Sequence, residues 1–229
     1  MHGLGGTGDV WSGLCDHLTE WWPGGWVVPD LPGHGASPSL PSYSFGALAA
    51  AVAHAVEPGR PVAVLGHSLG GVVGLTLASG WFGFPVTGVC GLGVKVSWTP
   101  DDLAKAGALA KKPARVFDTR EEALDRAWKV AGLPGPSADS RLVRADGDGW
   151  RIALDAGAFS VGRPDLPGLL AASRAEVMLA AGESDPMSPA DHLRALVPAP
   201  VMLAGLGHSA HVQDPTALRP LVRWLSTLG

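Results

Sequence analysis

The stretch "PVAVLGHSLGGVVG", residues 61–74, runs from β-branched apolar residues into a cluster of glycines, with Ser68 at the junction. The apolar half predicts a short buried strand, and the residues after Ser68 predict a helix. A G-x-S-x-G nucleophile requires this setting of strand, sharp turn and helix. Gly66 and Gly70 fit it, because a β-carbon at either position would obstruct so tight a turn. We therefore predict that Ser68 is a nucleophile.

The same turn would project the Ser68 hydroxyl above the sheet, beside the positive end of the helix predicted at residues 69–79. There the backbone N–H of Leu69 can stabilise an oxyanion that develops on a substrate. The stretch therefore predicts a site for acyl transfer.

Further apolar runs predict a parallel sheet. They alternate with helical patterns, including 188–197 and 214–228, and such alternation is typical of a parallel sheet covered on both faces. The sequence therefore predicts an α/β fold with a mostly parallel central sheet flanked by helices. The predicted strands are Trp26–Leu31, Pro61–Leu65, Val86–Gly91, 175–182 and 199–207.

Charge divides the chain into two kinds of surface. Only 6 of the 38 charged residues lie in residues 1–94, whereas 23 lie between Lys95 and Asp165. Thr99, followed three residues later by Asp102, has the pattern of a helix start. We therefore predict an α/β core formed by residues 1–94 and 174–229, and a helical cap or lid insertion at 95–173.

Composition excludes several functions. The net charge of −4 leaves no basic stripe for phosphates, so nucleic acid is not an expected partner. The two cysteines favour reduced core thiols over a metal site or a disulfide, and we expect neither metal nor cofactor. The uncharged residues 61–94 are too rich in glycine for a membrane span, and no leader precedes them, so we expect a cytoplasmic protein without a membrane partner.

A serine nucleophile needs a histidine base and an acid that orients it. Functional residues of a parallel sheet gather at the carboxyl ends of its strands. His208 directly follows one predicted strand and Asp185 closely follows another, so we predict them as base and acid. His211 and Glu183 remain the alternatives for these two roles.

Four other polar residues near these motifs are expected to be structural. His67 is expected to pack beside the turn, and His2 to pack and form hydrogen bonds beneath its own loop. Asp30 and His34 are expected to stabilise a loop near the site.

Five segments together resemble successive signature loops of the α/β-hydrolase superfamily: "HGLGGTG" (2–8), "DLPGHGAS" (30–37), "GHSLGG" (66–71), "GESDPMSP" (182–189) and "GLGHSAHVQDP" (205–215). The resemblance implies Ser68 as nucleophile, Asp185 as acid and His208 as base, in the chain order of that fold. It also implies that the backbone N–H of Leu4 is the second oxyanion donor beside that of Leu69.

The sequence departs from that family at its start. In the family the His-Gly loop follows a strand in the middle of the sheet, whereas here the chain opens at Met1, so about three N-terminal strands are expected to be absent. Because such a sheet would leave unpaired backbone groups, we expect the natural chain to begin upstream of Met1.

The predicted function is a serine hydrolase of the carboxylesterase type that acts on a small acyl or ester substrate. One alternative is a carbon–carbon bond hydrolase or a menaquinone-pathway lyase with the same triad. "GHSAH" resembles the latter, and Arg115, Arg120 or Arg126 would bind its carboxylates. Another alternative is a ligand-binding member without turnover. Substrate identity and oligomeric state stay open.

Overall fold

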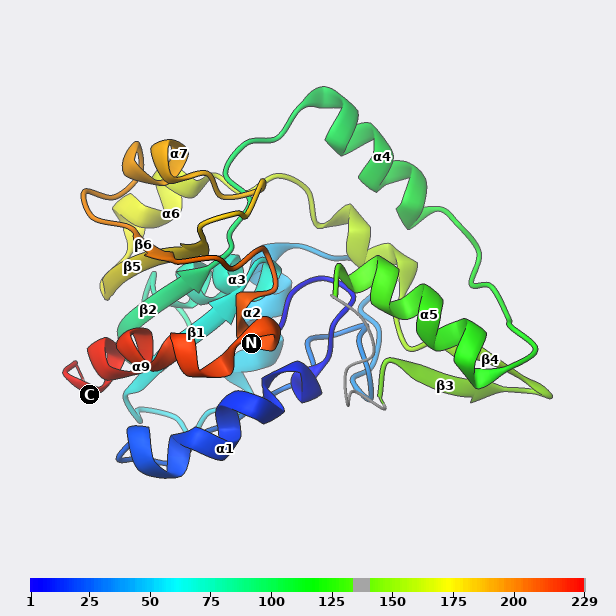
Figure 1. The fold of residues 1–229 in the computed structure, drawn as a ribbon, viewed down its shortest axis with the longest axis horizontal. Helices are drawn as coiled ribbons and strands as arrows, with labels where there is room; N and C mark the ends of the chain where they lie inside the picture. The colour runs from blue at the N-terminus through cyan, green and yellow to red at the C-terminus, as the bar shows by residue number, and fades with distance from the viewer. Residues whose placement is uncertain (134–140, 229) are drawn as a thin grey trace.

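A four-stranded parallel sheet forms the centre of the computed structural model, which describes residues 1–133 and 141–228 (Figure 1). Its strands are β1 (Val62–His67), β2 (Val86–Leu92), β5 (Glu176–Gly182) and β6 (Val201–Leu203), side by side in that order. All three pairings are parallel, so the carboxyl ends of the strands lie along one edge of the sheet. The predicted α/β fold class is confirmed.

Helices connect these strands and cover both faces of the sheet. The α-helices are α1 (Ser12–Trp21), α2 (Phe45–Ala53), α3 (Leu69–Leu77), α4 (Pro100–Ala110), α5 (Arg120–Ala131), α6 (Leu166–Ala172), α7 (Ala190–Arg194), α8 (Ala210–Gln213) and α9 (Arg219–Ser226). The 3₁₀ helices are η1 (Gly8–Trp11), η2 (Ala156–Val161) and η3 (Pro215–Leu218).

Alternation along β2 shows why this sheet needs helices on both sides. Val89 packs in the same cluster as Val73 of α3, whereas the next residue, Cys90, packs with Leu221 of α9 on the opposite face. Successive side chains of a strand point to opposite faces, so an apolar run of this kind is stable only when both faces are covered. In Figure 1, α1 and α9 lie in front of the sheet, and α2 and α3 lie behind it.

The predicted strand at Trp26–Leu31 is wrong, because this segment pairs with no strand among the described residues. A strand requires a neighbouring backbone, and the outer edge of β1 finds another partner at its carboxyl end. The amino group of Met1 donates to the Leu65 oxygen at 2.7 Å, and the His67 N–H donates to the Met1 oxygen at 2.9 Å. Along the rest of that edge, a cavity of about 710 Å³ is lined by residues 22–29 and 61–65.

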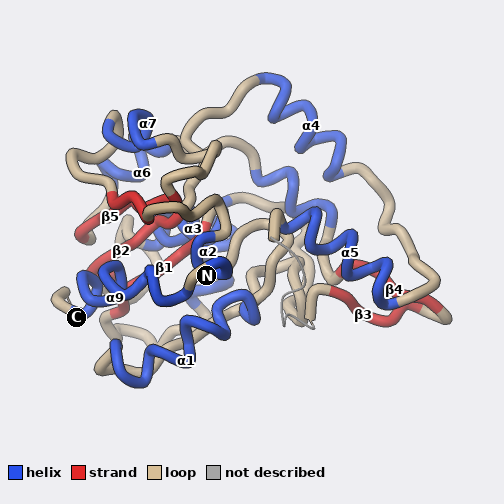
Figure 2. Tube along the Cα trace, viewed as in Figure 1, coloured by secondary structure: helices blue, strands red, loops and turns tan. Residues whose placement is uncertain are grey.

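The segment predicted as a cap, residues 95–173, contains α4, α5, η2 and α6, and its part at 134–140 lies outside the described residues. The predicted helix start is confirmed by a capping box, in which Thr99 and Asp102 each accept from the other's backbone N–H. An antiparallel hairpin of β3 (Val143–Asp146) and β4 (Gly149–Ile152) was not predicted. Figure 2 shows α4, α5 and the hairpin on one side of the molecule, away from the central sheet. The division into core and cap stays a prediction.

Candidate active site

Ser68 lies in the turn between β1 and α3, in a strained backbone conformation. Its φ is 48° and its ψ −113°, and it is the one non-glycine residue with a positive φ in the described part of the chain. Such a conformation costs about 1–3 kcal/mol and persists only where the surroundings hold it. They are crowded here, because a β-carbon on Gly66 would lie 2.3 Å from the Gly70 carbonyl oxygen. The predicted strand, sharp turn and helix are therefore present around a partly exposed Ser68.

The loop after β2 joins this turn to the next strand of the sheet. The Ser68 N–H donates to the Leu92 oxygen at 2.8 Å, and the Gly93 N–H donates to the Ala180 oxygen of β5, also at 2.8 Å. Gly93 has a φ of 62°, and a β-carbon on it would lie 3.2 Å from Asp185 Oδ2 and 3.3 Å from His208 Nδ1. Gly93 was not among the predicted site residues, although a glycine two positions after the predicted strand Val86–Gly91 was an available signal.

His208 and Asp185 form a hydrogen-bonded pair beside Gly93. His208 Nδ1 lies 2.9 Å from Asp185 Oδ2, and the Asp185 side chain is fully buried whereas that of His208 is 18% exposed. The second carboxylate oxygen, Oδ1, accepts from the Met187 N–H at 2.9 Å. Because an ionised carboxylate only accepts hydrogen bonds, His208 carries its proton on Nδ1 and leaves Nε2 free to accept a proton.

The electrostatics of this pair keep the acid ionised. Burial raises the pKa of Asp185, but the hydrogen bonds from His208 and from the Met187 N–H outweigh it, so the pKa lies below its ordinary value. A buried carboxylate of this kind orients an imidazole and stabilises it when it becomes protonated.

Both predicted oxyanion donors belong to segments that meet at Ser68. Leu69 is the first residue of α3, where the backbone N–H groups lack partners within the helix. Leu4 follows Gly3, which packs so closely on the turn that a β-carbon on it would lie 3.3 Å from Ser68 Cβ. The loop that carries Leu4 is therefore in contact with the turn that carries Ser68.

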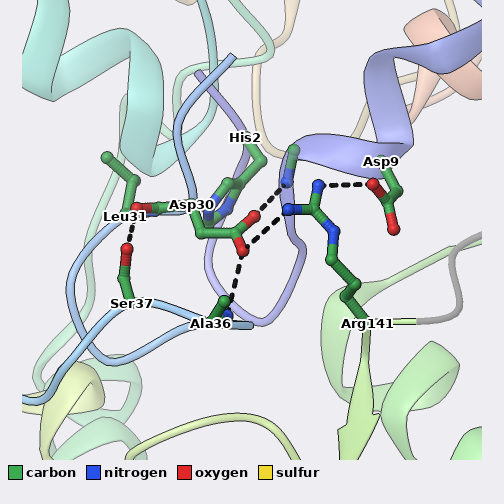
Figure 3. Close-up of polar contacts among 8 residues, drawn as sticks. His2, Asp9, Asp30, Leu31, Ala36, Ser37 and Arg141 are labelled. Carbon is green, nitrogen blue, oxygen red and sulfur yellow. Dashed lines mark hydrogen bonds and ion pairs between the residues drawn. The ribbon is translucent and has the colours of Figure 1, made fainter. Parts of the chain in front are cut away.

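Buried polar contacts hold this Leu4 loop at both ends (Figure 3). At one end His2 Nε2 accepts from the Leu31 N–H at 2.8 Å, and at the other Asp30 Oδ1 accepts from the Gly8 N–H at 2.7 Å. His2 is fully buried, and its ring packs 5.0 Å from that of His34. These contacts agree with the predicted structural roles of His2, Asp30 and His34.

Arg141, which belongs to the 95–173 segment, contacts two acidic residues near the Leu4 loop. Its guanidinium group donates to Asp30 Oδ2 at 3.1 Å and forms an ion pair with Asp9 (Figure 3). The same Asp30 oxygen accepts from the Ala36 N–H at 3.0 Å. The sequence analysis did not single out Arg141, because an exposed arginine far along the chain carries no local signal of this contact.

The two alternative candidates make other contacts than the predicted base and acid do. His211 is 1% exposed and its ring packs on that of Trp11 with centroids 4.5 Å apart, and neither of its ring nitrogens has a hydrogen-bond partner in the described part of the chain. Glu183 accepts from the Gly205 N–H at 3.0 Å. Neither residue takes part in the pair of His208 and Asp185.

The arginines considered for a carboxylate site contact aromatic rings within the 95–173 segment. The guanidinium carbon of Arg115 lies 4.5 Å from the Phe117 ring centroid, and that of Arg120 lies 5.9 Å from the Trp150 centroid. Arg126 is exposed on α5. The lyase alternative predicted arginines directed into a pocket, and these contacts do not favour it.

The chain is similar to known proteins over most of its length. The family described as the alpha/beta hydrolase family matches residues 1–221. The pimeloyl-[acyl-carrier protein] methyl ester esterase of Methylococcus capsulatus is 32% identical over 206 residues, which are 83% of this chain and 77% of that enzyme.

Solved structures share the fold. The thioesterase domain from the curacin biosynthetic pathway superposes with a TM-score of 0.76 at 22% identity, over 96% of this chain and 88% of that one. An esterase of Mycobacterium tuberculosis superposes with a TM-score of 0.74 at 24% identity, over 98% of this chain and 83% of that one.

Among residues 1–133 and 141–228, every helix is too short or too polar to span a lipid bilayer.

Proposed function

Because the chain belongs to the alpha/beta hydrolase family, we propose that it is a serine carboxylesterase with Ser68 as nucleophile, His208 as base and Asp185 as acid. The observation that carries the proposal is the 2.9 Å contact between His208 Nδ1 and the buried Asp185, placed beside the strained turn at Ser68. Its relatives named as esterases support the same class of reaction.

The reaction begins when His208 Nε2 removes the proton from Ser68 Oγ as this oxygen attacks the ester carbonyl. The carbonyl oxygen becomes an oxyanion, which the N–H groups of Leu69 and Leu4 stabilise. The protonated His208 then gives its proton to the departing alcohol, and an acyl group remains on Ser68. Water, activated by His208, releases the acid and restores the serine.

The substrate class follows from the site and from one relative. The N–H groups of Leu69 and Leu4 would stabilise the oxyanion that forms from a neutral carboxylic ester, which is the substrate class that we propose. The 32% identical relative is named for a methyl ester carried on an acyl carrier protein, and a short-chain alkyl ester is our starting substrate. We propose that the described part of the 95–173 segment covers the acyl group.

The proposal is tested by burst kinetics with p-nitrophenyl acetate and butyrate, beside Ser68→Ala and His208→Gln. We expect about one equivalent of p-nitrophenol in the burst of the wild-type protein, and none from either variant. A fluorophosphonate should add one label, located on Ser68 by peptide mass. A folded wild-type protein that neither turns over nor labels, but binds esters, would instead support the ligand-binding alternative.

A further inference from the structure

His67, which directly precedes Ser68, forms a hydrogen bond across the site. Its Nε2 lies 2.9 Å from the backbone oxygen of His208, which is 141 positions away in the sequence. A carbonyl oxygen only accepts, so His67 carries its proton on Nε2 and donates it. The side chain is buried, with the residue only 4% exposed.

Three segments of the site enclose this ring. It lies 4.6 Å from the ring of His208 and 4.3 Å from that of His211, measured between centroids. On another side, a β-carbon added to Gly3 would lie 2.7 Å from His67 Nδ1. The ring therefore fills the space between the turn of Ser68, the loop of Leu4 and the loop of His208.

The surroundings also fix the charge of the ring. Burial lowers the pKa of His67 well below its usual value, His211 and His208 lower it further, and the His208 carbonyl and Asp185 only partly oppose this. A neutral His67 does not compete with His208 for positive charge when the latter takes a proton from Ser68.

The loop that carries His208 needs such a contact. Two glycines precede His208 in this loop, Gly205, with a φ of 69°, and Gly207, and glycine gives a loop more conformational freedom than other residues do. The Gly207 N–H donates to Gln213 Oε1 at 2.7 Å, which holds the side of the loop before His208. The bond from His67 holds the His208 carbonyl itself.

We propose that His67 is a positioning residue, whose Nε2–H holds the backbone of His208 so that the imidazole stays aligned between Asp185 and Ser68. The inference rests on the proposed esterase function. It assigns His67 no proton transfer, and the residue acts only through the position of His208. A displacement of a catalytic group by about 1 Å costs on the order of 100-fold in rate, so one lost hydrogen bond is enough to be measured.

The test compares side chains of similar length with and without a donor. In His67→Gln the amide N–H reaches the region of Nε2, whereas His67→Met has nearly the same shape and no donor. We expect kcat for p-nitrophenyl acetate to fall about 10–100-fold in the methionine variant with KM changed less than threefold, and to stay within about fivefold of wild type in the glutamine variant. Fluorophosphonate should label the methionine variant slowly but to one equivalent.

Two further variants separate positioning from packing. His67→Phe keeps an aromatic ring without the donor and should behave like the methionine variant. His211→Phe alters the ring on the neighbouring side and should keep the wild-type rate. Thermal melts before the assays show which of His67→Met and His67→Phe is folded at the assay temperature. The kcat of that variant is then compared with those of wild type and His67→Gln.

Equal rates in the glutamine and donor-free variants would overturn the inference, and so would equal losses in His67→Phe and His211→Phe. A wild-type protein without burst or label is a different outcome, because it would refute the esterase proposal itself. The two failures are therefore distinguishable from the wild-type control alone.

Discussion

Replacing His211 by phenylalanine tests both the assignment of the base and the burial of a neutral histidine. The His211 ring packs on Trp11 and on His67, and neither of its nitrogens has a partner among the described residues. Phenylalanine keeps the ring and removes two unpartnered polar atoms, which cost about 1–3 kcal/mol when buried. Its slightly larger volume opposes this gain, so we expect similar stability of variant and wild type at pH 7.5.

The stabilities of wild type and of His211→Phe differ at acidic pH. Burial lowers the pKa of His211 from 6.5 to about 3, with smaller contributions from the Met1 amino group and the His208 and His2 rings. Above pH 6.5 the residue is neutral in both the folded and the unfolded state. Below pH 6.5 only the unfolded state binds the proton, so stability falls as the pH falls towards 3. At pH 5.0, about 1.5 pH units below the ordinary pKa of histidine, the stability lost through His211 is roughly 2 kcal/mol.

The assay is urea unfolding followed by tryptophan fluorescence at pH 7.5, 6.5, 5.5 and 5.0 for both proteins. A buried histidine that is not coupled to His211, such as His34, contributes equally in both proteins and cancels in the difference. His67 is coupled to the His211 ring, which lowers its pKa, so loss of that ring also relieves part of the cost of protonating His67 and adds to the gain of the variant at low pH. We expect the variant to gain about 2 kcal/mol on wild type between pH 7.5 and 5.0 while its kcat at pH 7.5 is unchanged. A constant difference within about 0.5 kcal/mol would refute the buried neutral His211. A loss of activity equal to that of His208→Gln would refute His208 as the base.

Three other substitutions and one thiol modification test further contacts and burial in the structure. Gly70→Ala would place a methyl group 2.5 and 2.6 Å from two backbone carbonyl oxygens at the start of the chain, so we expect at least tenfold lower kcat and about 1–3 kcal/mol of destabilisation in urea. Gly107→Ala, which meets no atom within 4 Å in α4, should instead stabilise by about 0.5–1 kcal/mol. Asp30→Asn keeps one acceptor oxygen but loses the negative charge that faces Arg141. We expect the free energy of unfolding in urea to fall by about 1–3 kcal/mol, and by less at 1 M salt. A decrease that is independent of salt would contradict a charge effect. The pKa of the buried Cys90 thiol is raised to about 12 by burial, so a disulfide reagent at pH 8 should modify Cys90 only after unfolding. Because Cys15 is partly exposed, peptide mass must locate the label, and modification of Cys90 in the native protein would contradict its burial.

The site was predictable where chemistry and strand ends coincide. Ser68, Asp185 and His208 each follow an apolar run, and parallel strands bring their carboxyl ends to one edge, so the spacing predicted that these residues lie near one another. The choice of His208 over His211 was harder, since the two are three positions apart. The position of His208 directly after a predicted strand favoured it, and its contact with Asp185 agrees with that choice.

The errors have physical causes. Trp26–Leu31 has the composition of a strand, but a strand also needs a neighbouring backbone, which the sequence does not specify. The hairpin at Val143–Ile152 was missed although Gly147 and Asp148 form a two-residue hairpin connection, with Gly147 at a φ of 59°. Its charged residues were taken as part of a helical segment. A high density of charged residues indicates that a segment is exposed to solvent, but it does not distinguish an exposed helix from an exposed hairpin.

The roles of the buried histidines were the least predictable feature, because they depend on which backbone group each ring meets. His2 Nδ1 lies 2.8 Å from the Gly3 oxygen and must donate there, so its Nε2 is left to accept from the Leu31 N–H. His67 has the opposite tautomer, since its Nε2 donates to the His208 oxygen. A neutral imidazole offers one donor and one acceptor. In His2 the donor is Nδ1, whereas in His67 it is Nε2. Protonation of His2 would place a second donor, Nε2–H, against the Leu31 N–H and break this hydrogen bond. Burial lowers the pKa of His2 and of His67 and so keeps both rings neutral. The neutral rings can then keep the hydrogen bonds that hold the loops of Leu4 and His208 beside Ser68.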